Sequence, residues 1–187
     1  MADFVQLNSR PVFFDASALV KLVLTEPGSE KANRIKSWAP WVDTSWICIA
    51  EVLGCLKRKW NAKELSDNAY SGHVYAFLSL MRDGAIHAVD VGRESSSQFG
   101  QCALLVPDIE LPLKLKDLDY EVDAADAIQL LIIRKHWAHR ALVQDQKLCF
   151  VSADRHLLQA AITEGIQTVS VITDLPDPVY DTCTKSP

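Results

Sequence analysis

Two aspartates stand where a carboxylate could take part in catalysis. Asp15 and Asp154 each end an apolar run that predicts a strand, and each precedes a stretch that predicts a helix. In open parallel α/β sheets the functional crevice lies at the carboxyl ends of the strands, so both carboxylates are expected at that edge. Aspartate is also a favoured helix N-cap, which is the alternative explanation for each residue. Ser17 and Ser152, two positions away, could cap a turn equally well.

Three further acids lie on predicted helices. The neighbours of Glu51 at three and four residues are apolar or small, so its carboxylate projects from a face where acids are rare unless paired, protonated or bound to a cation. Asp123 and Asp126 are three residues apart near a helix start and therefore share one face. Compensation of the helix dipole is the alternative role of these two aspartates.

Acids on four different elements would repel one another if they converged. Such carboxylates either have raised pKa values or bind a metal ion. Oxygen-only ligation suits Mg²⁺ or Mn²⁺ better than zinc, and these ions can activate water and stabilise the leaving oxygen in phosphodiester cleavage. The residue types therefore favour metal-dependent hydrolysis over chemistry that needs a separate side-chain base.

The elements that must position these acids alternate between apolar runs and amphipathic stretches, which predicts an α/β fold with a mainly parallel sheet. The expected strands cover 11–15, 41–45, 86–91, 148–154 and 168–173. The expected helices cover 16–28, 29–38, 46–60, 66–81, about 93–105, 123–138 and 155–164. We expect one domain over 1–187 with its core at about 11–173, an irregular insert at about 106–120 and a tail over 174–187.

Composition limits the class of protein. With 187 residues, 49% hydrophobic and 23% charged, the chain is expected to form one globular domain. Its net charge of -5 argues against indiscriminate nucleic-acid binding, although a pocket of carboxylates lowers the charge by itself. The N-terminus has no basic segment followed by a long apolar run, and no stretch approaches a membrane span, so we expect a cytoplasmic protein without a membrane segment. Five widely spaced cysteines predict reduced thiols rather than a disulfide framework or a zinc site.

Four segments resemble the motifs of PIN domains, and they occur in the order of that family. They read FFDASALVKLVLTEPGSE, TSWICIAEVLGCLKR, VDAADAIQLLI and FVSADRHLLQAA, and together they span residues 12 to about 172. The resemblance implies a three-layer α/β/α sandwich around a mainly parallel sheet, dependence on Mg²⁺ or Mn²⁺, and endoribonuclease activity. It makes Asp15, Glu51, Asp126 and Asp154 the catalytic, metal-binding acids, and it has Ser17 and Ser152 help to position Asp15 or the metal.

Many short bacterial PIN proteins are VapC-like toxins of type II toxin–antitoxin pairs. These toxins form homodimers, and a cognate antitoxin inhibits them by placing a basic segment in the acidic pocket. The resemblance therefore implies RNA as substrate, an antitoxin protein as partner and a homodimer. The segment 106–120 is longer and more irregular than in the smallest toxins, and Asp123 competes with Asp126 as the possible metal ligand.

Two other functions are alternatives to the ribonuclease. A receiver-like phospho-acceptor domain would have an adjacent acidic pair after the first strand and a lysine at the end of the last strand, and both are absent from this sequence. A catalytically silent PIN-like scaffold would bind RNA or a protein partner, and such scaffolds usually lose one or more acids. Basic residues at the end of the Glu51 helix, Lys57, Arg58 and Lys59, are expected on a solvated face, and would hold RNA phosphates if they bordered the pocket.

Overall fold

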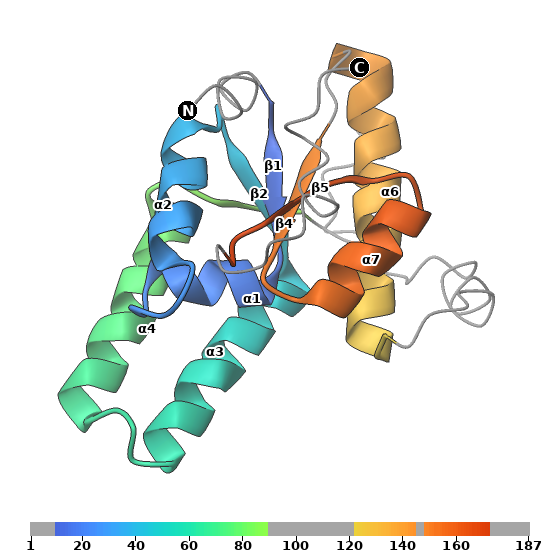
Figure 1. Cartoon of the computed structure of the whole chain (residues 1–187). Helices are drawn as coiled ribbons and strands as arrows, with labels where there is room; N and C mark the ends of the chain where they lie inside the picture. Colours follow the sequence, from blue (N-terminus) through green and yellow to red (C-terminus); the bar gives the residue numbers. More distant parts are fainter. Residues whose placement is uncertain (1–9, 90–121, 145–147, 173–187) are drawn as a thin grey trace, which may run out of the picture.

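The computed structural model describes residues 10–89, 122–144 and 148–172, with only the backbone for 135–144 (Figure 1). Its five described strands form one parallel sheet in the order β3-β2-β1-β4-β5. The strands are β1 (Val12–Phe14), β2 (Val42–Ser45), β3 (His87–Val89), β4 (Cys149–Ser152) and β5 (Gln167–Ser170). Helices surround this sheet, as in a three-layer sandwich, which confirms the predicted fold class.

The helices connect successive strands. They are α1 (Ala16–Leu19), the 3₁₀ helix η2 (Val20–Leu22), α2 (Ser29–Trp38), α3 (Trp46–Asn61), α4 (Asp67–Arg82), α6 (Ala124–Gln144) and α7 (Arg155–Thr163). The chain runs outward from β1 to β2 and β3, and then returns to place β4 on the other side of β1. The strand order therefore reverses between β1 and β4. In sheets of this kind the functional crevice lies at that reversal, beyond the carboxyl ends of the strands.

The two central strands form the middle of the core. Phe13 and Phe150 lie on paired positions of β1 and β4, both are fully buried, and their ring centroids are 6.3 Å apart. Every residue of both strands is buried, which is the pattern of a parallel strand covered on both faces. This packing fixes the carboxyl ends of β1 and β4 side by side.

Helices α3 and α4 pack against each other and are joined by a short turn (Figure 1). Ser45 caps α3 by accepting the N–H of Cys48 at 3.1 Å. The turn beyond α3 is held by Trp60, whose indole N–H donates to Asp67 at 2.7 Å. The start of α3 is thus fixed at the end of β2, and its length carries the helix away from the sheet.

The structure differs from the predicted elements mainly after β1. One helix was expected over 16–28, but α1 ends at Leu19 and a 3₁₀ turn follows. The β-branched Val20, Val23 and Thr25 lower helix propensity there. Gly28 then takes a left-handed conformation, φ 91°, and a Cβ at this position would lie 2.6 Å from the carbonyl oxygen of Val171.

Other expectations agree to within a few residues, except for α6, which extends to Gln144. The helix expected near 93–105, the insert at 106–120 and the tail at 174–187 lie outside the described residues. Cys48 and Cys55 are free thiols, whereas Cys149 is disulfide-bonded, so the expectation of reduced cysteines is wrong for Cys149. Spacing along the chain does not reveal which cysteines the fold brings together. None of the helices described here is long and apolar enough to span a membrane.

Candidate functional site

Asp15 follows β1 and is the most constrained acid of the site. Its carboxylate accepts hydrogen bonds from the backbone N–H of Ala18 at 2.8 Å, from Ser152 Oγ at 2.8 Å and from Ser17 Oγ, which lies 2.8 and 2.9 Å from its two oxygens. The alternative explanation of Asp15 as an N-cap thus holds for its contact with Ala18. The capping contact uses one oxygen, and the two serine contacts fix the orientation of the whole group.

Both serines also bind the turn that follows β4. Ser17 Oγ accepts the N–H of Ala153 at 2.8 Å, and Ser152 Oγ accepts the N–H of Asp154 at 2.9 Å. Each hydroxyl therefore links Asp15 to the β4–α7 turn, where Asp154 stands. Because every donor in this network has an acceptor, the network positions Asp15 and Asp154 as one unit.

The protonation of Asp15 reflects opposing effects. The side chain is almost fully buried, and this desolvation raises its pKa to about 6, with a smaller contribution from the charge of Asp154. The hydrogen bonds from Ala18, Ser17 and Ser152 act in the other direction because they stabilise the charged form.

Asp154 is exposed and caps α7. Its Oδ1 accepts the N–H of His156 at 2.8 Å and of Leu157 at 3.1 Å, so the N-cap explanation is correct for this residue too. Both contacts use the same oxygen. The other oxygen, Oδ2, accepts no hydrogen bond from the residues that the structure describes.

Glu51 lies in the second turn of α3 and is only partly exposed, as its apolar neighbours predicted. Its Oε2 accepts a hydrogen bond from the side-chain amide of Gln129 on α6 at 2.9 Å. Burial and the charge of Asp123 raise the pKa of Glu51, while the bond from Gln129 and the charge of Arg58 lower it. Gln129 is 1% exposed, and its Oε1 has no hydrogen-bond partner among the described residues.

The two aspartates at the start of α6 have different surroundings. Asp123 is exposed and accepts the backbone N–H of Asp126 at 2.9 Å, which is a capping contact. Asp126 is partly buried, and burial raises the pKa of its carboxyl to about 7. The remaining causes are the charges of Asp123, Asp154, Glu51 and Asp15, in that order. The charges of the other four acids therefore all raise the pKa of Asp126.

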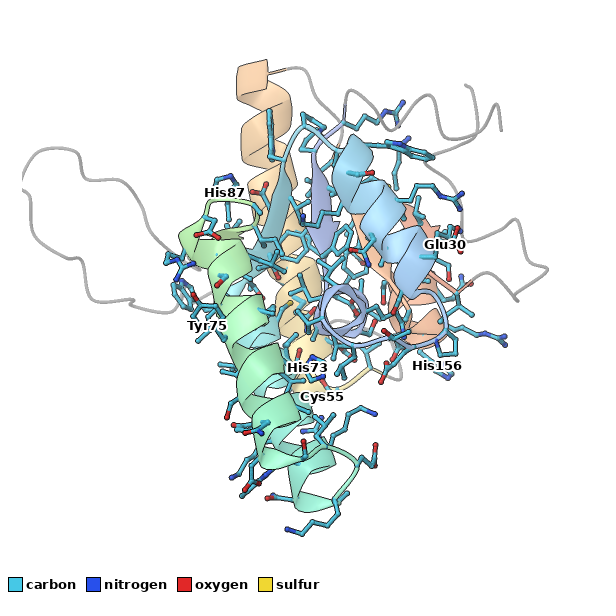
Figure 2. The ribbon with its side chains drawn as sticks, turned by 90° about the vertical axis from the view of Figure 1, so that its left-hand side faces the viewer. Glu30, Cys55, His73, Tyr75, His87 and His156 are labelled. Carbon is cyan, nitrogen blue, oxygen red and sulfur yellow. The ribbon has the colours of Figure 1, made fainter. Side chains whose placement is uncertain are left out.

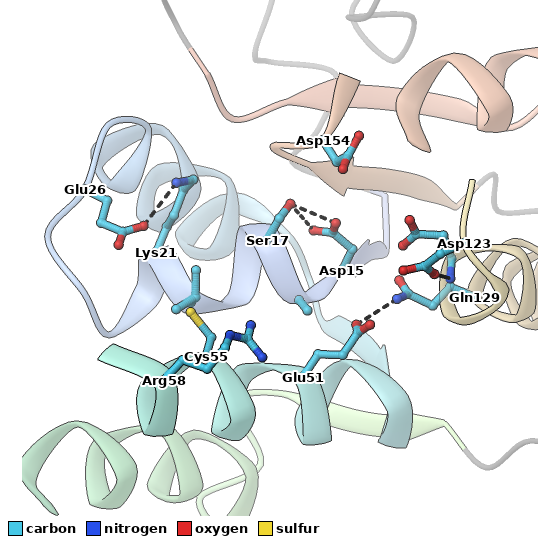
Figure 3. A pocket seen from close by; sticks show the side chains of 13 residues that line it. Asp15, Ser17, Lys21, Glu26, Glu51, Cys55, Arg58, Asp123, Gln129 and Asp154 are labelled. Atoms are coloured by element: carbon cyan, nitrogen blue, oxygen red, sulfur yellow. Dashed lines mark hydrogen bonds and ion pairs between the residues drawn. The ribbon is translucent and has the colours of Figure 1, made fainter. Parts of the chain in front are cut away.

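These side chains face one pocket of about 530 Å³ (Figure 3). Its acidic end is formed by Asp15, Ser17, Glu51, Asp123, Asp126, Gln129 and Asp154. Its other end is formed by Lys21, Glu26, Cys55 and Arg58 together with small or apolar side chains. All the acids singled out from the sequence, and Ser17, thus lie at the same pocket, while Ser152 lies just behind it, against Asp15.

The acidic end offers the donors that a hard divalent cation prefers. Five carboxylates line one space. Burial and the charges of the other four raise the pKa of Asp126, and a bound cation would offset that repulsion. In the present side-chain positions, however, no three His, Cys, Asp or Glu side chains of the described residues are arranged so that they could hold a metal ion. The charge of the site fits Mg²⁺ or Mn²⁺, and ligation would require side chains to move. Figure 2 shows the described histidines, His73, His87 and His156, on separate elements, which gives no basis for a zinc site.

Sequence reasoning missed Gln129, Lys21 and Glu26 and gave Arg58 only a conditional role. Gln129 was not singled out, although a glutamine among apolar residues on the helix of Asp126 was a detectable signal. Arg58 was expected on a solvated face, with a phosphate-binding role only if it bordered the pocket, and it does border the pocket. Lys21 and Glu26, which form an ion pair at 3.5 Å, carried no sequence signal.

Comparison with models of known protein families gave no match, and comparison with curated proteins gave none either.

Proposed function

We propose that this chain is a metal-dependent endoribonuclease of the PIN type, which hydrolyses RNA phosphodiester bonds in the presence of Mg²⁺ or Mn²⁺. The observation that carries the proposal is the position of Asp126. Its pKa is raised to about 7 by burial and by four other carboxylates that reach the same pocket from separate parts of the chain. Concentrated negative charge of this kind is expected where a cation binds in function.

The residues proposed to hold the ion are Asp15, Glu51, Asp126 and Asp154, with Asp123 as a possible substitute for Asp126. Asp15 supports this role because its carboxylate is oriented by Ser17 and Ser152 before any ligand binds. The exposure of Asp123 and its capping bond favour Asp126 over Asp123 as ligand. When bound, the ion would lower the pKa of a water molecule and stabilise the leaving oxygen.

We further propose that the protein acts in the cytoplasm as the toxin of a type II toxin–antitoxin pair and forms a homodimer. The support is the resemblance of four ordered segments to VapC-like proteins, together with an acidic pocket that would attract the basic segment of an antitoxin. Light scattering of the purified chain, and its co-purification with the product of an adjacent small gene, test the two assemblies.

The decisive test is cleavage of a mixed RNA pool by the purified protein with Mg²⁺, with Mn²⁺ and with a chelator. We expect metal-dependent cleavage by the wild type and none by Asp15→Asn. The matched control is Asp83→Asn, because Asp83 is an exposed aspartate at the end of α4, far in sequence from any residue of the pocket. Cleavage by Asp15→Asn at the wild-type rate would contradict the proposal.

A second candidate is a catalytically silent PIN-like scaffold that binds RNA or a protein partner. It is favoured by one observation, namely that no three acids of the described residues are arranged to hold an ion in this conformation. Calorimetric titration with Mn²⁺ separates the candidates: the ribonuclease is expected to bind Mn²⁺ at the pocket and to lose binding in Asp126→Asn, whereas the scaffold would bind RNA without binding metal.

A further inference from the structure

Three positively charged side chains occur on the last two turns of α3, and two of them are already engaged. Lys59 Nζ lies 3.1 Å from Glu26 and 3.2 Å from Glu64. Lys57 Nζ lies 3.7 Å from the centre of the Trp60 ring. The ammonium of Lys59 is therefore ion-paired, whereas that of Lys57 makes a cation–π contact with Trp60.

Arg58 differs from both lysines. Its guanidinium forms no hydrogen bond or ion pair with any residue that the structure describes, and it lines the pocket. A Cβ placed on Gly54 would lie 3.5 Å from Nη1 of Arg58, so the guanidinium lies back over the preceding turn of α3. Figure 3 shows the Arg58 side chain extending from α3 beside Cys55.

The guanidinium and the acidic end of the pocket are close enough to interact. Glu51, Cys55 and Arg58 lie four and then three residues apart on α3, so they share one face of the helix, and all three line the pocket. The charge of Arg58 lowers the pKa of Glu51. Seven residues of helix correspond to a rise of about 10 Å, which the folded-back side chain shortens. An RNA strand bound at the acidic end of the pocket would reach Arg58 one or two nucleotides from the acids.

We propose that the Arg58 end of the pocket is a binding subsite for a phosphate of the RNA strand, one or two linkages from the bond that is cleaved. This inference rests on the proposed ribonuclease function and deepens it. A planar guanidinium without a protein partner matches a phosphate, to which it can donate two parallel hydrogen bonds. Because Lys21 forms an ion pair with Glu26, Arg58 is the cation without a direct ion pair or hydrogen bond among the described residues that line the pocket.

The subsite also explains how a chain of net charge -5 could bind RNA. Phosphate binding depends on local cations, and one free guanidinium beside a metal-loaded acidic cluster supplies a positive site where the strand passes. Because Lys59 beside Arg58 is ion-paired with Glu26 and Glu64, we expect binding to be weak and confined to the pocket.

The test measures binding separately from cleavage. A fluorescent single-stranded RNA of about 12 nucleotides is titrated with protein in Ca²⁺, which replaces the catalytic ion, and fluorescence anisotropy is recorded at several salt concentrations. The variants are Arg58→Gln, Arg58→Lys and, as a matched control from the adjacent position, Lys57→Gln. Both residues are exposed, so the substitutions should leave the melting temperature unchanged.

We expect Arg58→Gln to weaken binding by about 10-fold and to reduce the slope of log K against log salt by about 0.7, as the loss of one phosphate contact requires. Arg58→Lys should keep the slope but bind less tightly than the wild type, because the ammonium lacks the bidentate fork. Lys57→Gln should bind as the wild type does.

A second arm locates the phosphate. In a series of probes that each carry one neutral methylphosphonate linkage, the wild type should lose about 10-fold at one linkage near the cleaved bond, and Arg58→Gln should lose nothing further there. If Arg58→Gln binds like the wild type, or still loses affinity at the linkage where the wild type does, the subsite does not exist. Absence of measurable binding by the wild type overturns it as well.

The two proposals can fail separately. If the methylphosphonate result is obtained but no metal supports cleavage, the subsite stands and the ribonuclease proposal falls. If cleavage depends on Asp15 but Arg58→Gln cleaves and binds like the wild type, the ribonuclease proposal stands and the subsite falls.

Discussion

Asp15 and Asp126 face the same pocket, but the protein holds them in different ways. Asp15 is nearly fully buried and accepts hydrogen bonds from a backbone N–H and two serine hydroxyls. Asp126 is partly buried, and its carboxylate accepts no hydrogen bond from the described residues. Both pKa values are raised, yet only that of Asp126 is raised by the charges of four other acids.

The difference separates two requirements of a cation site. If the pocket binds the proposed ion, the hydrogen bonds around Asp15 would hold one ligand in place beforehand, which would lower the entropic cost of binding. Burial and repulsion at Asp126 penalise its charged form in the metal-free protein, so a cation bound there would be stabilising. Asp15 would then contribute the geometry of the proposed site, and Asp126 would contribute its affinity.

Replacing each aspartate by asparagine is the strongest way to break this comparison. Both Asp15→Asn and Asp126→Asn should reduce cleavage by about 1000-fold, since each removes a charged ligand. Their effects on folding should have opposite signs. Asp126→Asn removes a charge that burial and repulsion both penalise, and should stabilise the metal-free protein by about 1–2 kcal/mol at pH 8, after allowance for its partial exposure.

Asp15→Asn should destabilise the protein, because its NH₂ replaces one of the two carboxylate oxygens. Either the N–H of Ala18, which donates to Oδ1, or the hydroxyl of Ser152, which donates to Oδ2, then loses its acceptor. Urea unfolding in chelator measures both changes. Equal shifts of the two variants in the same direction would show that the two aspartates are held alike.

The pH dependence of stability sharpens the same comparison. Because the folded state binds a proton at Asp15 and Asp126 more tightly than the unfolded chain does, this contribution to stability is fully present below about pH 4. It is lost as the pH rises through the folded pKa values of about 6 and about 7. Between pH 5 and pH 8 the metal-free protein should therefore lose about 2–3 kcal/mol of unfolding free energy, after allowance for the partial exposure of Asp126.

Saturating Mn²⁺ should reduce this loss, because the ion replaces the protons at high pH. Urea titrations at several pH values, with chelator or with Mn²⁺, provide the measurement. A metal-free stability that is flat over this range would mean that burial and the neighbouring charges do not raise the pKa values of these two carboxyls.

The sequence allowed the fold and the acids to be predicted for definite physical reasons. Fully apolar strands such as VFF and CFVS are recognisable without a partner, and an aspartate that follows such a strand must lie at the carboxyl edge of a parallel sheet. Glu51 was identified because a carboxylate on an apolar helix face is unusual. Each of these signals is local to a few residues.

What the sequence did not reveal depends on contacts between distant segments. The bond from Gln129 to Glu51 joins positions 78 residues apart, and the bond from Ser152 to Asp15 joins positions 137 apart. The early end of α1 follows from weak helix propensity and a turn closed against Val171, and only the first of these can be read locally. That Arg58 lacks an ion pair with any described residue, whereas the neighbouring Lys59 has one, likewise depends on contacts in the folded structure.

Single substitutions of Ser17 and Ser152 test the hydrogen bonds that hold Asp15, and their expected effects are smaller. Ser152→Ala and Ser17→Ala should each lower the cleavage rate by about 10-fold, as expected for a group that orients a metal ligand. Each loss also removes a hydrogen bond that lowers the pKa of Asp15, so the pH at which activity reaches half its maximum should move upward.

Ser29→Ala is a suitable control, because Ser29 hydrogen-bonds Leu24 and Glu26 in the turn before α2 and does not contact Asp15. The measurement is a pH–rate profile in Mn²⁺. A rate that falls without any shift of the profile would mean that the serine supports the fold rather than the carboxylate.

The smallest expected effect concerns Gln129, whose side-chain amide donates a hydrogen bond to Glu51. Gln129→Leu keeps a similar volume but removes the hydrogen bond, so the pKa of Glu51 should rise further and cleavage at pH 6.5 should fall by a few-fold. The folded protein should lose little stability, since leucine also removes a buried carbonyl oxygen that has no partner in the described residues. Raising the pH or the Mn²⁺ concentration should restore the rate, because either change favours the ionised carboxylate. A loss that neither condition restores would instead make Gln129 a ligand in its own right, with Oε1 as the donor atom.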